Sequence, residues 1–309
     1  MQARVRATRA AAAALLSLLV AVPATARAAT DPPPQDGSAP ATSDITTTTG
    51  WYTPDQADSI TIFEPAATGS YPAVIFVHGG AWGRSQPNSY ELDWARGLAQ
   101  QQGWLVAVIG YPAKVAHEQV VEPDALAEAI AAISHRSDVD INQIALWGES
   151  AGGQLALLAA YRDAKALHPV ISAVVSISGP TDMRTEYNSF AQTWLHAVTR
   201  FEGMTPRAAR HAGSKRYALT SPADIVSGLD PPTFQAISRL DRLVPANQVK
   251  VLTQRLTRAN VTHRSVWLPG DGHSTAIENQ QPPGSDYTVQ QLAVSFIIAS
   301  FDQHRVSFD

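Results

Sequence analysis

The segment Gly148–Gly153 carries the residue types that nucleophilic catalysis needs. It has the sequence Gly-Glu-Ser-Ala-Gly-Gly, and it lies between the apolar run Ile144–Trp147 and an Ala- and Leu-rich stretch, Ala151–Tyr161. A strand, a tight turn and a helix in this order, with the pattern G-x-S-x-G, expose a serine hydroxyl at the turn. The helix N-terminus adds its dipole there. We therefore expect Ser150 to be a nucleophile and the Ala151 N–H to stabilise an oxyanion. The alternative is a glycine-rich turn without a chemical role.

A second glycine-containing segment, His78–Gly83, follows the apolar run Ala73–Val77 and has the sequence His-Gly-Gly-Ala-Trp-Gly. Adjacent glycines let the backbone turn its N–H groups toward one point, as a second set of oxyanion donors requires. We expect the N–H groups of Gly79 and Gly80 to be those donors. We expect His78 to hold the loop in place rather than to act as a base.

A candidate base stands late in the chain. The segment Asp271–Ser274 has the sequence Asp-Gly-His-Ser and follows the strand-like run His263–Leu268. A histidine titrates near neutral pH, so it can take the serine proton and return it. The chain order Ser, Asp, His favours a base in a loop after the last strand, which selects His273 among the nine histidines.

The candidate acid is Asp241, which follows the run Thr233–Ile237 and precedes a helical stretch. An aspartate at this place in the chain order would fix the histidine tautomer and stabilise the imidazolium. Three other aspartates are less suitable: Asp230 precedes the strand, Asp271 is too close in sequence to turn back onto His273, and Asp182 follows a strand on the side of the insertion.

Trp82 and Glu149 lie within these motifs and are the candidates for the lining of a substrate pocket. Trp82 could equally belong to the core, where large aromatic side chains are commonly found. A stretch from Asp182 to about Ser227 has no clear strand, which predicts a helical cap insertion over the sheet. Its aromatic residues form either an apolar lid or core packing: Phe190, Trp194 and Phe201.

Short apolar runs alternate with helical stretches from Ser59 onward. This alternation predicts an α/β fold with a mainly parallel central sheet flanked by helices. The expected strands are Ile60–Phe63, Ala73–Val77, Leu105–Ile109, Ile144–Trp147, Val170–Ile177, Thr233–Ile237 and His263–Leu268. The expected helices are Asp124–His135 with Asp124 as N-cap, Ala151–Tyr161, Ala246–Ala259 and Val289–Phe301. Ligands of open α/β sheets bind at the carboxyl ends of the strands, where the motifs above stand.

Composition limits the function classes further. The chain has 309 residues, of which 45% are apolar and 16% charged, enough for a large core. The absence of cysteine excludes a disulfide scaffold, a Cys-ligated metal site and a thiol nucleophile. The net charge of −4 gives no nucleic-acid footprint. The chemistry expected of these motifs needs no metal and no organic cofactor.

The N-terminal residues 1–28 have the pattern of a secretory signal peptide. They contain four arginines and no acidic residue, then the apolar run Ala10–Val22, then the small-x-small site Ala26–Ala28. The run is too short to span a bilayer comfortably, and an uncleaved anchor or a buried helix is the alternative. Residues 29–49, rich in Pro, Ser, Thr and Asp, predict a flexible linker, and residues 50–309 one folded domain. We expect a secreted protein, extracellular or periplasmic, without a membrane span after signal removal.

From Ser59 to the C-terminus the motifs resemble the α/β-hydrolase superfamily, in particular the branch of hormone-sensitive lipase and the small secreted carboxylesterases. The resemblance implies an α/β-hydrolase fold, with Ser150, Asp241 and His273 as nucleophile, acid and base. It also assigns the oxyanion donors to Gly79, Gly80 and Ala151. The chain departs from the family pattern twice: Ile237-Ser238 stands where members usually have His-Gly, and Tyr111-Pro112 where they usually have Tyr-Arg.

The function implied is a secreted serine hydrolase that cleaves small-molecule carboxylic esters through an acyl-enzyme. A serine amidase, peptidase or arylformamidase would use the same groups, because all pass through a tetrahedral intermediate. A non-catalytic binding protein on the same fold is a third interpretation. The sequence leaves open the acyl and alcohol groups, a plant cell-wall ester included, and the oligomeric state.

Overall fold

The predicted parallel sheet is present and extends further than expected. A computed structural model describes residues 44–53, 58–112, 122–184, 192–211, 213 and 215–306. The strands among them are β1 (Ile45–Trp51), β2 (Ser59–Pro65), β3 (Tyr71–Val77), β4 (Leu105–Ile109), β5 (Val139–Glu149), β6 (Ile171–Ile177), β7 (Thr233–Ser238) and β8 (His263–Leu268). They form one sheet in the order β1-β2-β4-β3-β5-β6-β7-β8. The pairs from β4 to β8 are parallel, whereas β1–β2 and β2–β4 are antiparallel.

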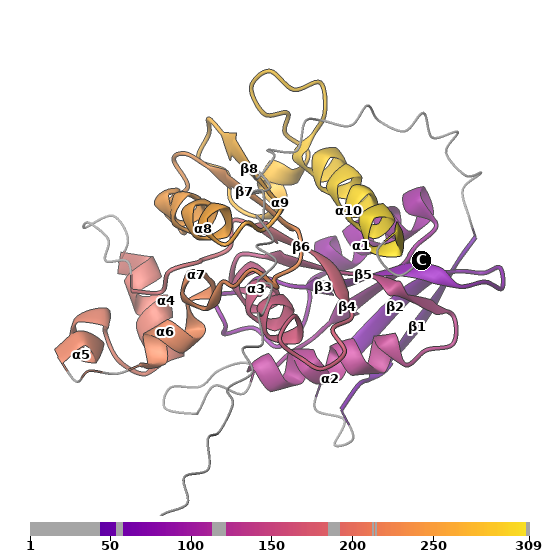
Figure 1. The fold of residues 1–309 in the computed structure, drawn as a ribbon, viewed down its shortest axis with the longest axis horizontal. Helices are drawn as coiled ribbons and strands as arrows, with labels where there is room; N and C mark the ends of the chain where they lie inside the picture. Colours follow the sequence, from indigo (N-terminus) through magenta and orange to yellow (C-terminus); the bar gives the residue numbers. More distant parts are fainter. Residues whose placement is uncertain are drawn as a thin grey trace, which may run out of the picture.

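Helices cover both faces of this sheet (Figure 1). The large ones are α1 (Ser89–Gln102), α2 (Glu122–Ser134), α3 (Ala151–Asp163), α8 (Asn247–Arg258) and α10 (Val289–Val306), and α9 (Thr275–Glu278) is a single turn. In β3, Ile75 and Val77 belong to the same core cluster as side chains of α2, α3 and α8, whereas Val74 and Phe76 belong to the cluster on the other face, with side chains of α1 and α10. Burial on both faces explains why the central strands are continuously apolar. No described helix is both long and apolar enough to cross a membrane.

The predicted C-terminal boundary of the linker, residue 49, is wrong, because β1 already begins at Ile45. Four successive threonines of β1 are exposed, so the strand shows no apolar alternation that would reveal it in the sequence. Its backbone pairs with β2 along seven positions, and threonine suits an edge strand of this kind. The predicted signal peptide, residues 1–28, and the linker up to residue 43 lie outside the described residues.

Helix α1 was not predicted, and α2 begins earlier than expected. In α1 the side chains of Trp94, Leu98 and Ala99 are buried, but polar residues surround them in the sequence. Helix α2 starts at Glu122, so Asp124 lies inside the helix and is not its N-cap. Pro123 therefore lies in the first turn, where its missing N–H costs no hydrogen bond.

The helix after the β5 turn lies unusually close to the strands. A Cβ atom added to Gly152 would lie 2.1 Å from the carbonyl oxygen of Val77 at the end of β3. A Cβ atom added to Gly148 would lie 2.2 Å from the carbonyl oxygen of Gly152. Both contacts are with backbone, which cannot rotate away as a side chain can. The two glycines therefore permit the tight passage from β5 into α3.

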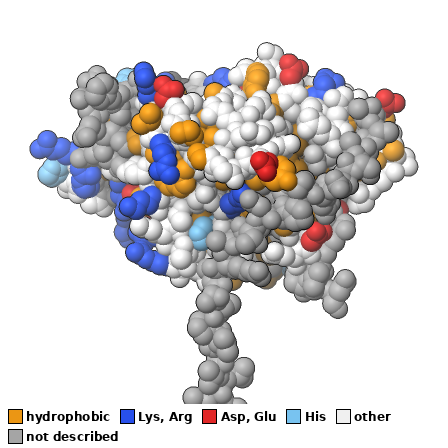
Figure 2. Space-filling model, turned by 90° about the horizontal axis from the view of Figure 1, so that it is seen from above, with side chains coloured by type: hydrophobic (Ala, Val, Ile, Leu, Met, Phe, Trp, Pro, Cys, Tyr) orange, Lys and Arg blue, Asp and Glu red, His pale blue; other side chains and the backbone are white. Residues whose placement is uncertain are grey.

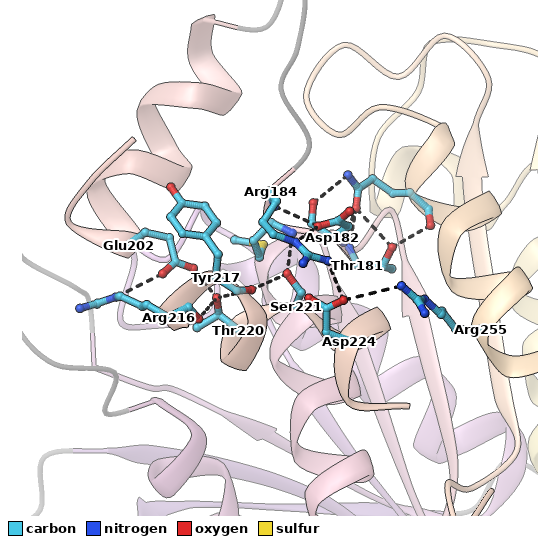
Figure 3. Close-up of polar contacts among 12 residues, drawn as sticks. Thr181, Asp182, Arg184, Glu202, Arg216, Tyr217, Thr220, Ser221, Asp224 and Arg255 are labelled. Carbon is cyan, nitrogen blue, oxygen red and sulfur yellow. Dashed lines mark hydrogen bonds and ion pairs between the residues drawn. The ribbon is translucent and has the colours of Figure 1, made fainter. Parts of the chain in front are cut away.

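The predicted cap insertion is helical and lies between β6 and β7. It contains α4 (Gln192–Glu202), α5 (Pro206–His211), α6 (Arg216–Thr220) and α7 (Pro222–Ile225). Figure 3 shows how polar contacts attach it to the sheet domain. The side-chain oxygen of Gln248 accepts hydrogen bonds from the N–H groups of Thr181 and Asp182, each at 2.7 Å. Ser221 Oγ accepts from the N–H of Met183 at 2.9 Å, which joins the two ends of the insertion.

The outer side of this insertion is basic, although the whole chain has a net charge of −4. Basic side chains gather at the end of the molecule where α5 lies (Figure 2). Those of α5 are exposed: Arg207, Arg210 and His211. The other face of the insertion contributes Val198 and Phe201 to the core. The insertion is thus amphipathic, with its apolar side toward the sheet domain.

We predict that Gly152→Ala lowers the free energy of unfolding by about 3 kcal/mol or more, because the added methyl group overlaps backbone. Gly97→Ala in α1 is the matched control. A Cβ there meets nothing within 4 Å, and alanine should stabilise the helix by about 0.5–1 kcal/mol. Urea unfolding of both variants provides the measurement. Equal midpoints for the two variants would contradict the packing argument.

Candidate active site

Ser150 occupies a strained backbone conformation between β5 and α3. Its φ is 51° and its ψ is −121°, a region that residues with a side chain rarely adopt. The conformation is held by a hydrogen bond from its own N–H to the carbonyl oxygen of Ile177, 2.8 Å away on β6. The close packing of Gly148 and Gly152 holds the turn on both sides. The serine thus stands at the carboxyl end of the central strand, as predicted.

Three predicted side chains from three separate turns form a continuous chain of hydrogen bonds. His273 Nε2 lies 2.8 Å from Ser150 Oγ, and His273 Nδ1 lies 2.7 Å from Asp241 Oδ2. Because an ionised carboxylate only accepts, the network assigns the proton to Nδ1 and leaves Nε2 free to accept the serine proton. The arrangement has the geometry of a nucleophile, a base and an orienting acid.

The Asp241 carboxylate is fixed from its other side as well. Its Oδ1 accepts hydrogen bonds from the N–H groups of Leu243 at 2.8 Å and Val244 at 2.9 Å. The turn closes with the Asp241 N–H donating to the carbonyl oxygen of Ser238 at 3.2 Å, so it forms without the usual His-Gly pair. The three rival aspartates have other partners: Asp182 with Arg184, Asp230 with Ser227, and Asp271 with Arg242.

The predicted oxyanion residues Gly79, Gly80 and Ala151 line one cavity together with Ser150. A Cβ atom on Gly79 would lie 3.2 Å from the Cβ of Ser150, so the loop after β3 passes directly over the serine. Gly80 has a φ of 126°, which only glycine adopts without strain. These positions suit oxyanion donors, and Ala151 adds the first N–H of α3.

His78 holds this loop and is not placed to act as a base. It is fully buried, and its ring stacks on Tyr111 with centroids 4.3 Å apart. Burial lowers the pKa of His78 to about 4, so the ring is neutral at physiological pH. The Tyr111 hydroxyl donates to the carbonyl oxygen of His78 at 2.8 Å. The Tyr111-Pro112 departure from the family pattern therefore lies beside the loop 78–83, which we call the oxyanion loop after its predicted role.

The cavity has a volume of about 420 Å³, and both apolar and polar residues line it. The apolar lining residues are Ala81, Trp82, Pro180, Ala197, Leu243 and Val244. The polar lining residues include Arg84, Asn88, Glu91, Glu149 and Thr275. Both predicted pocket residues, Trp82 and Glu149, are thus at the cavity. The sequence prediction missed Arg84, Asn88 and Glu91, although the pattern Asn-x-x-Glu ahead of a helix could have indicated a capping box.

Trp82 lines the cavity and packs at the same time. Only 2% of its surface is exposed, and its ring stacks on Phe201 of α4 with centroids 4.5 Å apart. Its indole N–H donates to Gln154 Oε1 at 2.9 Å. The tryptophan therefore connects the oxyanion loop to the insertion. Of the other predicted lid residues, Phe190 and the side chain of Trp194 lie outside the described part of the chain.

Glu149 and Glu278 form a buried pair of interacting carboxyl groups beside the cavity. Burial, and then the charges of Glu278 and Glu91, raise the pKa of Glu149 well above its ordinary value. Burial also raises the pKa of Glu278 to about 8, opposed by the hydrogen bond from Trp147 Nε1 at 3.0 Å. The pair therefore retains at least one proton at neutral pH. Within the described residues, no group of three or more acidic or histidine side chains is arranged to hold a metal ion.

The sequence is similar to a known protein family. The BD-FAE family model matches residues 60–256. A "probable carboxylic ester hydrolase LipM" of Mycobacterium tuberculosis is 27% identical over 208 residues, which cover 62% of this chain and 46% of that protein. The chain thus spans less than half the length of this relative.

Solved structures that resemble the chain include esterases. Esterase B from Lactobacillus rhamnosis has a TM-score of 0.64 and 19% identity, covering 85% of this chain and 89% of that one. Carboxyl esterase 2 from Tuber melanosporum has a TM-score of 0.62 and 17% identity, covering 85% and 88%. At this identity the likeness shows the fold, and the fold is that of the α/β-hydrolases.

We predict that stability falls with rising pH more steeply in the wild type than in Glu278→Gln. The folded protein holds a proton on Glu278 that the unfolded chain releases. The free energy of unfolding therefore falls as the pH rises from about 5 to about 8. The glutamine keeps an acceptor for Trp147 and cannot ionise. Thermal unfolding across that pH range is the measurement, with Asp302→Asn, an exposed residue of α10, as the control for charge. Parallel curves for wild type and Glu278→Gln would contradict this account.

Proposed function

The chain belongs to the BD-FAE family, and from that premise we propose that it is a secreted serine carboxylesterase. The observation that carries the proposal is the chain of hydrogen bonds from Ser150 through His273 to Asp241. Ser150 and His273 line a cavity that the oxyanion loop also lines. The carboxylic ester hydrolase relative and the esterase structures support ester cleavage as the reaction.

In the first half of the proposed reaction, His273 Nε2 takes the proton of Ser150 as Oγ attacks the ester carbonyl carbon. The carbonyl electron pair moves to oxygen, where the N–H groups of Gly79, Gly80 and Ala151 stabilise the negative charge. The tetrahedral intermediate collapses, the bond to the alcohol oxygen breaks, and His273 gives that oxygen its proton. The alcohol leaves, and the acyl group remains on Ser150.

In the second half, water attacks the acyl-enzyme and His273 takes its proton. The intermediate collapses with return of the proton to Ser150 Oγ, which releases the carboxylic acid. Asp241 keeps Nδ1 protonated throughout and stabilises the imidazolium that forms twice per turnover. None of these steps draws on a metal or an organic cofactor.

The cavity supports a short or medium acyl group. Its apolar lining includes Trp82, which is fixed by its stacking on Phe201 and its hydrogen bond to Gln154. A side chain held in this way does not move aside readily for a long acyl chain. We expect acetate and butyrate esters to be cleaved faster than palmitate esters.

Secretion rests on the sequence of residues 1–28. Cleavage after Ala28 would leave Ala29 as the first residue of the mature protein. N-terminal sequencing of the protein from the culture medium or periplasm tests this. A protein that retains Met1 and stays in the cytoplasm would refute it.

We predict that Ser150→Ala lowers kcat/KM for p-nitrophenyl acetate by about 10³-fold or more, because the nucleophile is removed while the cavity remains. Ser134→Ala, at the end of α2, is the matched control and should retain wild-type activity. The matching p-nitroanilide, measured in parallel, decides between esterase and amidase. A Ser150→Ala protein with near wild-type esterase activity would refute the proposed mechanism.

A further inference from the structure

One carbonyl group of the oxyanion loop is held by an unusual number of donors. Arg84 donates to the Gly79 oxygen from Nη2 at 2.9 Å and from Nε at 3.3 Å. His78 Nδ1 approaches the same oxygen at 2.6 Å, and the Tyr111 hydroxyl at 3.5 Å. The position of this carbonyl group is therefore set by side chains and not by a strand or helix ladder.

This carbonyl group determines where the next N–H points. The carbonyl of Gly79 and the N–H of Gly80 belong to one planar trans peptide unit, so they point in opposite directions. Donors that hold the Gly79 oxygen on one side therefore hold the Gly80 N–H toward the other. The same donors polarise the peptide, which makes its N–H a stronger donor.

The side chain of Arg84 packs directly against Gly80. A Cβ atom on Gly80 would lie 2.7 Å from the Cβ of Arg84 and 3.0 Å from its Nε. The glycine is thus required for the approach of the arginine as well as for the φ of 126°.

Arg84 is itself held by a carboxylate that belongs to a helix cap. Its Nη2 lies 2.5 Å from Glu91 Oε1, and only 4% of the Glu91 side chain is exposed. Glu91 Oε2 accepts from the N–H of Asn88 at 2.7 Å, and the Glu91 N–H donates to Asn88 Oδ1 at 3.0 Å. This reciprocal capping box fixes the start of α1. Glu91 therefore ties the arginine to a packed helix.

We propose that Arg84, held by Glu91, is a positioning residue that aims the Gly80 N–H at the developing oxyanion. The inference rests on the proposed function, since it concerns a residue that serves the same reaction. Arg84 needs no contact with the reacting atoms for this role, because it acts through the peptide unit between Gly79 and Gly80.

The test compares Arg84→Met, which keeps an apolar stem but no donor, with Arg96→Met, a control on α1 whose guanidinium lies over Phe63. We expect kcat/KM of Arg84→Met for p-nitrophenyl acetate to fall about 10- to 100-fold through kcat, with KM nearly unchanged. The thiono analogue of the ester, with C=S in place of C=O, should lose much less, because sulfur is a weak hydrogen-bond acceptor.

Equal losses on the ester and its thiono analogue would overturn the inference, and so would a change confined to KM, which indicates a direct substrate contact. Glu91→Gln, which removes the charge and keeps a cap acceptor, should show the same selective loss in weaker form. It also serves as the test variant if Arg84→Met does not fold. Ser150→Ala separates the two proposals: if it is inactive while Arg84→Met and Glu91→Gln retain wild-type rates, only the inference about Arg84 fails.

Discussion

The contact between the first turn of α3 and the end of β3 is the constraint on which the site depends. Because the Val77 oxygen lies where a Cβ of Gly152 would be, the helix can approach the strand only with a glycine at that position. This approach forces the chain to turn sharply at Ser150, at a φ of 51°. The oxyanion loop begins one residue after Val77. One backbone contact therefore sets both the nucleophile and the loop above it.

Acidic side chains around the site differ in what surrounds them, and this separates their roles. Asp241 accepts two backbone N–H groups and faces His273, which suits an anion that orients a base. Glu149 and Glu278 lie together in a buried place, and burial raises the pKa values of both, so the pair retains a proton at neutral pH. Glu91 faces Arg84 and a helix cap. The same chemical group thus serves as an acid that orients a base, as a member of a buried pair that retains a proton, and as the structural partner of an arginine.

The sequence predicted the parts of the fold and site that rest on local patterns. Continuous apolar runs identified β3 and β4, and the order Ser, Asp, His identified the three side chains that the structure brings together. The edge strand β1 was not predicted, because its threonines are exposed on both faces. Glu278 was not predicted as a site residue, because its pairing with Glu149 depends on the placement of the short helix α9, which no local pattern reveals. Arg84 was not predicted as a site residue, because its proposed role depends on the direction of one carbonyl group, that of Gly79.

The central claim is that Ser150 is a nucleophile activated by His273, and covalent labelling tests it most directly. The protein would be treated with a fluorophosphonate, its mass measured intact, and the modified peptide sequenced. The account predicts one adduct per chain, on Ser150, and a labelling rate that drops sharply in His273→Ala. An adduct on another residue, or an unchanged labelling rate in His273→Ala, would contradict it.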